Sequence, residues 1–415
     1  MGTVVNEHVG AWELPERWEW HALGDVCEIN PRKPSVERDE DAPTSFVPMA
    51  ALDEERGAIT DMQVKPYNEV NRGYTYFEEN DVLFAKITPC MDNGKSAIAR
   101  GLIDGIGFGS TEFHRIRPGG QLIPEWVHLF VRQQSFRDEA ASRFRGSVGQ
   151  QRVPKEFLQS HLIPVPPTMA TQRRIVARIE ELFAHIEEAR RLSGIAGGET
   201  ERLMEAVTVN VFPDPEKPLP SGWQVSKIAD ISQKPQYGYT ESAREEPIGP
   251  RFLRITDIQE GEVNWETVPF CPCTEQELEK YRLKRGDIVF ARSGATTGKT
   301  FLVRDCPEAI FASYLIRLQI REGVLPEYVY AFFQSPYYWQ QIQPRGAAQP
   351  NVNATILSEL TVPIPLAIED QRDIVADLED VWTQEKALKR AQEAAGAELN
   401  HLEQSILAQA FRGDL

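Results

Sequence analysis

Two stretches of this chain, "TQRRIVARIEELF" at residues 171–183 and "DQRDIVADLEDVW" at residues 370–382, write nearly the same amphipathic helix twice. Ile175 of the first stretch aligns with Ile374 of the second, an offset of 199 residues (374 minus 175). The same offset aligns two further pairs of segments: "VPKEFLQSHLIPVP" (153–166) with "VNATILSELTVPIP" (352–365), and "ETERLMEAVTVNVF" (199–212) with "ELNHLEQSILAQAF" (398–411). A constant register over this length indicates an internal repeat.

The repeat continues less strictly toward the N-terminus, as loop insertions would cause. There the matching pairs are "LPERWEWHALGDV" (14–26) with "LPSGWQVSKIADI" (219–231), and "DVLFAK" (81–86) with "DIVFAR" (287–292). Proline-rich stretches at 164–168 and 363–366 mark where each globular part stops, because proline interrupts helices and central strands. We therefore expect four segments: a first globular domain at 1–163, a central helical spacer at 164–212, a second globular domain at 213–362 and a C-terminal helical spacer at 363–415.

The composition is that of an ordinary globular protein, with 415 residues, 41% hydrophobic and 26% charged,. No run of about 18 apolar residues occurs, so we expect no membrane span. Five cysteines are few and odd in number, which favours a reducing cytoplasm over a disulfide framework,. Cys271 and Cys273 have no second Cys or His pair nearby, so we expect no zinc site and no other metal or cofactor.

Each repeated helix carries an apolar stripe with the spacing of a coiled-coil seam. The stripes comprise Ile175, Ile179, Leu182 and Ile186 in the first helix, and Ile374, Leu378, Val381 and Leu388 in the second. We predict that the helices pair with each other in antiparallel fashion, since a whole domain lies between them. The alternative is that each helix packs separately on its own domain core.

Glycines at 197–198 and 396 predict that each helix is interrupted and followed by a shorter one,. A helix of about 24 residues before the break would span roughly 36 Å, comparable with one turn of DNA.

The globular parts carry mostly strand and turn signals, such as "DVLFAKI", "FLRIT" and "SYLIRLQI",. Helices are expected at 124–143 and 326–342, each near a proline,. The predicted fold class is α+β: two similar β-rich globular domains separated by an antiparallel two-helix coiled coil, with a pseudo-twofold internal repeat.

The stretch "SGATTGKT" at 293–300 resembles a phosphate-binding P-loop. However, Gly294 and Gly298 are separated by three residues where four are required, and "FLVRD" after it reads as a strand,. A glycine-rich loop between two strands is the better interpretation.

Several loops carry the Arg, Lys, Gln, Asn, Ser and Thr side chains that read base edges or contact phosphates in DNA. The alternative is that these loops are simply solvated. The DNA-binding candidates are Lys86, Thr88, Lys95, Arg145, Ser147, Gln150, Gln151, Arg152, Arg292, Ser293, Thr296, Thr297, Lys299, Arg345, Gln349, Asn351 and Asn353, with Tyr237, Tyr239, Asn30, Arg32 and Lys33 as weaker ones. We find no catalytic set: no S-adenosylmethionine loop, no amino-methylating motif and no nuclease cluster.

Taken together, these motifs resemble the specificity (S) subunit of type I restriction–modification systems over nearly the whole chain. The stretches that carry the resemblance are "DVLFAKITPCMDNGKSAIA" (81–99), "GSTEFHRIRP" (109–118), "GQQRVPKEFLQSHLIPVPP" (149–167), "DIVFARSGATTGKTFLV" (287–303), "SYLIRL" (313–318) and "ILAQAFRGDL" (406–415).

The resemblance implies a non-catalytic DNA-recognition subunit with two target-recognition domains. Each would read one half of a split site in double-stranded DNA, and the coiled coil would set the gap. Two methyltransferase subunits, and restriction subunits in the cleaving complex, would be its partners. Family members usually have the motif "PPLxEQ" before each helix, whereas this chain has Thr171 or Asp370 where Glu is usual. Thr and Asp are both good helix N-caps.

Two other functions stay open. One is the corresponding subunit of a type IIB enzyme, whose partner chain joins methylation and cleavage, and the other is a coiled-coil assembly scaffold that binds no DNA. The net charge of −17 argues at face value against DNA binding,. We hypothesise that basic loops face DNA and that partner subunits supply much of the phosphate contact.

Overall fold

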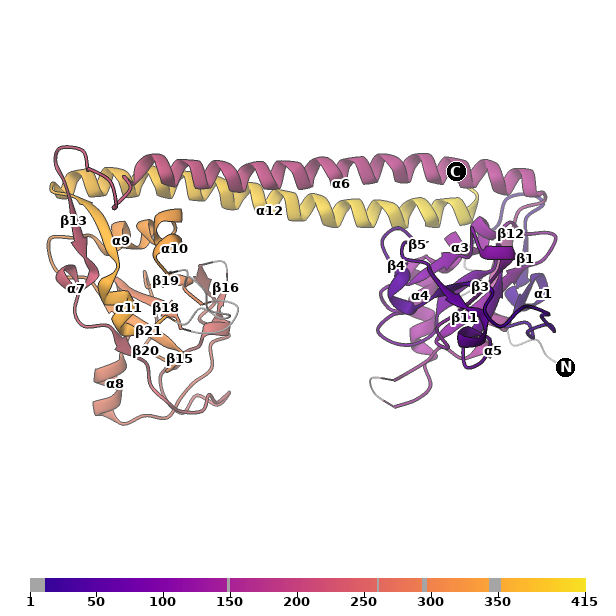
Figure 1. The fold of residues 1–415 in the computed structure, drawn as a ribbon, viewed down its shortest axis with the longest axis horizontal. Helices are drawn as coiled ribbons and strands as arrows, with labels where there is room; N and C mark the ends of the chain where they lie inside the picture. Colours follow the sequence, from indigo (N-terminus) through magenta and orange to yellow (C-terminus); the bar gives the residue numbers. More distant parts are fainter. Residues whose placement is uncertain (1–11, 148–149, 260, 293–296, 343–351) are drawn as a thin grey trace. The chain divides into compact units, whose positions relative to one another are not determined.

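The computed structural model describes residues 12–147, 150–259, 261–292, 297–342 and 352–415. The chain divides into two units, Met1–Leu192 with Ala394–Leu415, and Ser193–Glu393. Each unit combines a globular α+β domain with parts of two long helices, α6 (Met169–Val211) and α12 (Ile368–Arg412), as Figure 1 shows. Within the described residues, no helix has the length and apolar character needed to cross a membrane.

The domain of unit 1 is built on two four-stranded sheets, with strand orders β2-β11-β8-β9 and β6-β3-β10-β7. Its strands are β1 (Glu19–Ala22), β2 (Cys27–Ile29), β3 (Pro43–Val47), β4 (Leu52–Asp53), β5 (Ala58–Ile59), β6 (Gln63–Pro66), β7 (Thr75–Glu78), β8 (Val82–Ala85), β9 (Ser96–Ile98), β10 (Ile106–Gly109), β11 (Phe113–Pro118) and β12 (Leu162–Val165). Its short helices are α1 (Leu23–Val26), α2 (Tyr67–Val70), α3 (Pro124–Val131), α4 (Gln134–Ser142) and α5 (Lys155–Ser160).

The domain of unit 2 repeats this plan, with a four-stranded sheet of order β14-β21-β18-β19 and a parallel pair β15-β20 that corresponds to β3-β10. Its strands are β13 (Trp223–Lys227), β14 (Gln236–Tyr237), β15 (Arg251–Leu253), β16 (Ile258–Gln259), β17 (Glu262–Val263), β18 (Asp287–Ala291), β19 (Thr300–Leu302), β20 (Ala309–Phe311), β21 (Leu315–Gln319) and β22 (Thr361–Pro365). Its short helices are α7 (Ile228–Ile231), α8 (Glu275–Tyr281), α9 (Pro326–Phe332), α10 (Pro336–Ile342) and α11 (Ala354–Glu359).

A two-stranded antiparallel ribbon closes each domain by pairing its first strand with its last. In unit 1, β1 pairs with β12, and in unit 2, β13 pairs with β22. Pro164 and Pro363 lie in these last strands. They are tolerated because a two-stranded ribbon leaves each strand an edge that needs no ladder hydrogen bond.

The two long helices are continuous, which corrects the predicted interruptions. α6 runs for 43 residues and α12 for 45 residues, and Gly194, Gly197, Gly198 and Gly396 lie inside them. A glycine in a helix costs only about 1 kcal/mol relative to alanine. The surrounding good helix formers, and the contacts at both ends of each helix, outweigh that cost.

The two helices pair in antiparallel fashion. In unit 1, Arg190 of α6 donates hydrogen bonds from Nη2 to Asn400 Oδ1 (2.7 Å) and Glu403 Oε2 (2.9 Å) of α12. In unit 2, Gly197 of α6 lies next to Gln392 of α12. Residues with higher numbers in α6 therefore lie beside residues with lower numbers in α12, as in any antiparallel pair.

The predicted apolar stripes do not face each other, however. Ile175, Ile179 and Ile186 are buried in the core of unit 1, with Leu182 packed against it, beside the end of α12. Leu378 is buried in the core of unit 2, with Ile374 packed against it, beside the end of α6. Val381 is half-buried, and Leu388 is 44% exposed and so lies outside any buried seam. Both sequence-based alternatives thus hold in part: the helices pair, yet each stripe packs on its own domain.

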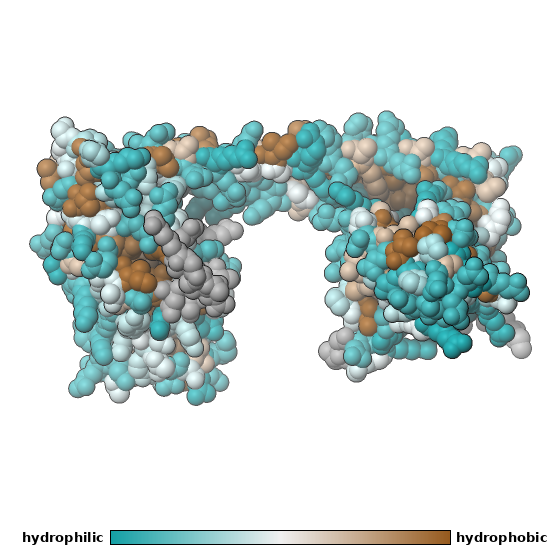
Figure 2. All heavy atoms as spheres, in the orientation of Figure 1, coloured by the Kyte–Doolittle hydropathy of each residue, from teal (hydrophilic) through white to brown (hydrophobic). Residues whose placement is uncertain are grey.

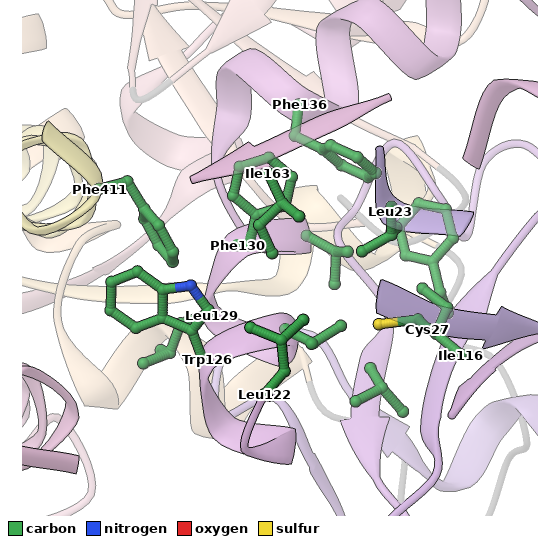
Figure 3. Packing of buried hydrophobic residues seen from close by; sticks show 14 of the residues in the cluster. Leu23, Cys27, Ile116, Leu122, Trp126, Leu129, Phe130, Phe136, Ile163 and Phe411 are labelled. Carbon is green, nitrogen blue, oxygen red and sulfur yellow. The ribbon is translucent and has the colours of Figure 1, made fainter. Parts of the chain in front are cut away.

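The end of each long helix is anchored in a domain core by one aromatic side chain. Phe411 of α12 packs against Trp126 and Phe130 of unit 1, with its ring centroid 4.5 and 5.3 Å from theirs (Figure 3). At the equivalent place in unit 2, Phe212 follows α6 and packs on Tyr328 and Phe332. The end of α12, which follows the second domain in the chain, therefore completes the core of the first domain. The end of α6, which follows the first domain, completes the core of the second.

A buried glutamine ties the start of each long helix to its domain. Gln172 Oε1 accepts a hydrogen bond from the Ile123 backbone N–H (3.0 Å), and Gln371 Oε1 accepts one from Leu325 (3.0 Å). The N-cap expectation needs a correction. Thr168, not Thr171, caps α6, because its Oγ1 accepts from the Thr171 N–H (3.1 Å). Asp370 lies in the first turn of α12, where its charge favours the helix dipole,.

Candidate nucleic-acid interface

In unit 1, three segments meet where strand β8 ends. The Lys86 N–H donates to the Glu112 carbonyl (2.9 Å), and the Val153 N–H donates to the Lys86 carbonyl (2.8 Å). The Thr88 N–H donates to the Gln151 carbonyl (3.1 Å). These backbone bonds bring the loop after β8, the residue before β11 and the loop before α5 into one surface, which we call site 1.

The charged side chains of site 1 surround one carboxylate. Arg152 forms a bidentate ion pair with Glu112, with Nε to Oε2 at 2.9 Å and Nη2 to Oε1 at 2.7 Å. Lys86 Nζ lies 4.0 Å from Glu112 and donates to the Thr111 carbonyl (2.7 Å). The hydrogen bond from Arg152 holds the pKa of the Glu112 carboxyl below its usual range, so it is ionised at neutral pH.

The loop before α5 presents the other candidates of site 1. Arg145 and Arg152 exchange two backbone hydrogen bonds (3.0 and 2.9 Å), which close this loop as a small hairpin. Arg145, Ser147 and Gln150 are exposed, and Gln151 is half-exposed. Arg145 has only a loose ion pair with Glu156, at 3.7 Å. The hairpin therefore offers several polar side chains to a partner.

Two candidates of unit 1 are engaged elsewhere. Lys95 donates from Nζ to the Leu52 carbonyl (2.9 Å) and pairs with Glu54 (3.1 Å), away from the Arg152 cluster. The Thr88 hydroxyl donates to Asp92 within its own turn. The sequence pattern did not identify these partners.

Asn30, a weaker DNA-binding candidate, is linked to site 1 by hydrogen bonds through His114. Its Oδ1 accepts from the Arg115 N–H (2.9 Å), and its Nδ2 lies 2.9 Å from His114 Nδ1. His114 Nε2 lies 2.8 Å from the Val153 carbonyl, which can only accept, so Nε2 carries the proton and Nδ1 accepts from Asn30,. Burial lowers the pKa of His114 to about 4, which keeps the ring neutral.

Unit 2 has the same junction where strand β18 ends, and we call it site 2. The Arg292 N–H donates to the Tyr314 carbonyl (3.1 Å), and the Val352 N–H donates to the Arg292 carbonyl (3.1 Å). The Arg292 guanidinium lies over the Tyr237 ring, 5.2 Å from its centroid. Tyr237 accepts a hydrogen bond at its hydroxyl from the Ala354 N–H (3.2 Å), which fixes the ring.

The remaining candidates of unit 2 lie outside this cluster or outside the described residues. Asn353 caps α11, since its Oδ1 accepts from the Ile356 N–H (2.9 Å). The Tyr239 ring packs on Tyr281, and Thr297 is buried. Lys299 is exposed and lines a groove of about 1410 Å³ on unit 2. Ser293, Thr296, Arg345, Gln349 and Asn351 lie outside the described residues.

Sequence reasoning missed two residues of the interface, Glu112 and Tyr314. Both come directly before the central strand of their sheet, and both accept the equivalent backbone hydrogen bond. Tyr314 is 63% exposed, a large fraction for an aromatic side chain. The signal that could have found them is the alignment of "TEF" (111–113) with "SYL" (313–315), in which the middle residue alone changes its chemistry strongly.

The visible face of each unit is mostly hydrophilic, with smaller apolar patches (Figure 2). Within the described residues, no group of three or more His, Cys, Asp and Glu side chains is placed to hold a metal ion. The notable arrangement is instead a pair of polar, partly exposed junctions at matching places in two homologous domains. That arrangement defines a modular protein in which two homologous domains carry matching polar junctions.

The chain belongs to the family of the type I restriction modification DNA specificity domain, whose model matches residues 15–195 and 220–395. Among relatives, the type I restriction enzyme EcoEI specificity subunit of Escherichia coli is 34% identical over 204 residues. That match covers 49% of this chain and 34% of the relative, so the chain matches only about a third of that relative's length.

Solved structures of this class match almost the entire chain. One, described as the structural basis of complex assembly and conformational transition of the type I R-M system, matches with a TM-score of 0.80 and 27% identity, covering 97% of this chain and 100% of that one. The HsdS subunit from Thermoanaerobacter tengcongensis matches with a TM-score of 0.57 and 26% identity, covering 98% and 99%. The predicted fold class is confirmed.

Proposed function

We propose that this chain is the DNA sequence-recognition subunit of a cytoplasmic type I restriction–modification complex. Each globular domain reads one half of a bipartite site in double-stranded DNA, and the paired helices α6 and α12 set the unread gap. The chain itself performs no chemistry. Two methyltransferase subunits modify adenine, and restriction subunits, where present, cleave DNA with ATP.

The observation that carries this proposal is that the two domains have equivalent junctions, site 1 and site 2. The same backbone hydrogen bonds build both junctions, yet the side chains they present differ. Site 1 holds the Glu112–Arg152 ion pair, whereas site 2 holds Arg292 stacked on Tyr237. A shared scaffold with different side chains supports two domains that read two different half-sites.

The chemistry of each junction suits a base edge or a phosphate. Arginine donates two parallel hydrogen bonds to guanine O6 and N7, and it also pairs with phosphate. Arg292 is kept oriented by the ring of Tyr237, and Arg152 by Glu112. A guanidinium that is already held in place loses less conformational freedom when it binds, which favours selective contacts.

The net charge of −17 is compatible with DNA binding if phosphate contacts are local and shared,. We assign the contacts of this chain to the basic loops, and much of the remaining phosphate contact to the methyltransferase partners. The isolated chain should therefore bind DNA weakly, with an affinity that falls as salt rises. Tight binding by the isolated chain that salt does not weaken would contradict this account.

The direct test uses Arg292→Ala in the chain assembled with its methyltransferase partners. Methylation rates on a library of sites should show relaxed selection at one base pair of a single half-site, by about 5- to 150-fold, which corresponds to about 1–3 kcal/mol. Arg285→Ala is a matched control, because this arginine has a side chain 70% exposed and lies just before β18, at the opposite end of the strand from Arg292. An equal loss of methylation rate on all sequences would show that Arg292 contacts only the sugar–phosphate backbone of DNA.

A further inference from the structure

Glu112 is an acidic side chain in the middle of a basic surface. Its side chain is 24% exposed, and its two oxygens accept hydrogen bonds from Nη2 and Nε of Arg152. A carboxylate at a DNA-facing surface repels phosphate, so its presence there calls for a specific reason.

The ion pair fixes the direction of the Arg152 guanidinium without exhausting its donors. A guanidinium has five N–H donors. Nε and Nη2 each donate to Glu112, and Nη1 donates to the Gln150 carbonyl (2.9 Å). These three bonds leave one N–H on each terminal nitrogen, and the Arg152 side chain is 40% exposed. Two adjacent donors are what guanine requires at O6 and N7 in the major groove.

The second domain shows that the fold does not require a carboxylate here. Tyr314 occupies the equivalent position and accepts the same backbone hydrogen bond, from Arg292 rather than Lys86. Strand β21, which starts directly after Tyr314, still pairs with β18 in the register that β11 and β8 use, with Leu315 opposite Ala291 as Phe113 is opposite Ala85. The carboxylate of Glu112 is therefore not needed to build the junction.

We propose that Glu112 is a positioning residue that holds Arg152 in the orientation needed to read a guanine in the half-site of the first domain. This inference rests on the proposed DNA-recognition function and names one specificity-determining pair within it. Glu112 acts through Arg152 and does not itself contact the base. Without the carboxylate, the flexible arginine samples many directions and also reaches phosphates.

The test compares Glu112→Ala, Arg152→Ala and the double variant with the wild-type chain, each assembled with its methyltransferase partners. Methylation rates are measured on sites that carry each base pair at each position of both half-sites. Arg152→Ala should lose about 5- to 150-fold of discrimination at one G·C pair. Glu112→Ala should lose discrimination at that same pair while keeping its overall affinity for DNA. The double variant should be no worse than Arg152→Ala, because the two residues act as one unit.

Three controls separate positioning from folding. Glu112→Gln retains an acceptor oxygen and the side-chain shape, and it should recover part of the discrimination. Thermal unfolding of each variant shows whether the domain stays folded. Tyr314→Ala, at the equivalent position of the second domain, should leave the half-site of the first domain unchanged.

The outcomes distinguish this inference from the proposed function. A wild-type complex without sequence preference would overturn the proposed function and this inference with it. A selective wild-type complex whose Glu112→Ala variant keeps full discrimination, or weakens equally on all sequences, would overturn the inference alone. Tighter binding by Glu112→Ala with unchanged selectivity would show that Glu112 only masks Arg152, which also overturns it.

Discussion

Replacing Phe411 with alanine should loosen the domain of unit 1, although this side chain lies near the far end of the sequence. Phe411 is 1% exposed and packs on Trp126 and Phe130. Truncating a buried phenylalanine costs about 3–5 kcal/mol, because the transfer free energy is lost and a cavity remains. If the local opening of α3 depends on this contact, its amide exchange should speed up by about 150- to 4,000-fold.

Hydrogen–deuterium exchange resolved by segment is the suitable assay, since one free energy of unfolding does not describe a chain with two units. The matched variant is Phe212→Ala, at the equivalent place in unit 2, where the side chain packs on Tyr328 and Phe332. Phe411→Ala should accelerate exchange in α3 and spare α9, whereas Phe212→Ala should do the reverse. Phe411→Ala with unchanged protection of α3, or with equal loosening of both units, would refute the reciprocal anchoring of the helices.

Three further perturbations test the supports of the sites and the gap. Gln172→Ala leaves the buried N–H of Ile123 without its acceptor, so the stability of unit 1 should fall by about 1–3 kcal/mol,. Hydrogen exchange of unit 1 in increasing urea measures this loss. A loss below about 0.5 kcal/mol, roughly the effect of a surface change, would contradict the role of Gln172. Folding lowers the pKa of His114 from 6.5 to about 4, so the folded state disfavours the charged ring. About 3 kcal/mol of stability is therefore present above pH 6.5 and is lost as the pH falls toward 4,. Burial also lowers the pKa of His128 and His161 in the same unit, so His114→Gln should reduce the pH dependence in that window without abolishing it. An unchanged profile would assign the pH dependence to other groups. Four residues inserted into both helices, after Gly197 and Gln392, should lengthen each helix by about 6 Å and widen the gap by nearly 2 base pairs, as mapped methylation sites would report; an unchanged gap would remove the helices' spacing role,.

The repeat in the sequence predicts most of the architecture. A constant offset of 199 residues between the two helices predicts two homologous domains and two similar helices, because a duplicated hydrophobic pattern must bury equivalent surfaces,. The pattern does not say which core an apolar stripe meets. Ile179 and Leu378 each belong to the hydrophobic core of a domain, which also includes residues from the end of the other long helix.

The details of the sites depend on partners that are distant in sequence. Arg152 appears in the sequence as a free base reader, but Glu112, 40 residues earlier, takes two of its donors. Asn353 appears as a polar contact, but it caps the helix that starts immediately after it,. Lys95 bonds Leu52 and Glu54, which no local pattern connects to it. Residue type limits the chemistry, whereas long-range pairing decides which side chains remain available.

The most direct measurement of the central claim is a map of methylated bases after exchange of one domain. Residues 1–160 would be replaced by the matching domain of a relative with a known site, and the assembled complex would modify genomic DNA. The account predicts a bipartite site in which one half changes to that of the donor, while the other half and the gap stay as before. A change in both halves, or a site that is no longer bipartite, would contradict the claim that each domain reads its half alone.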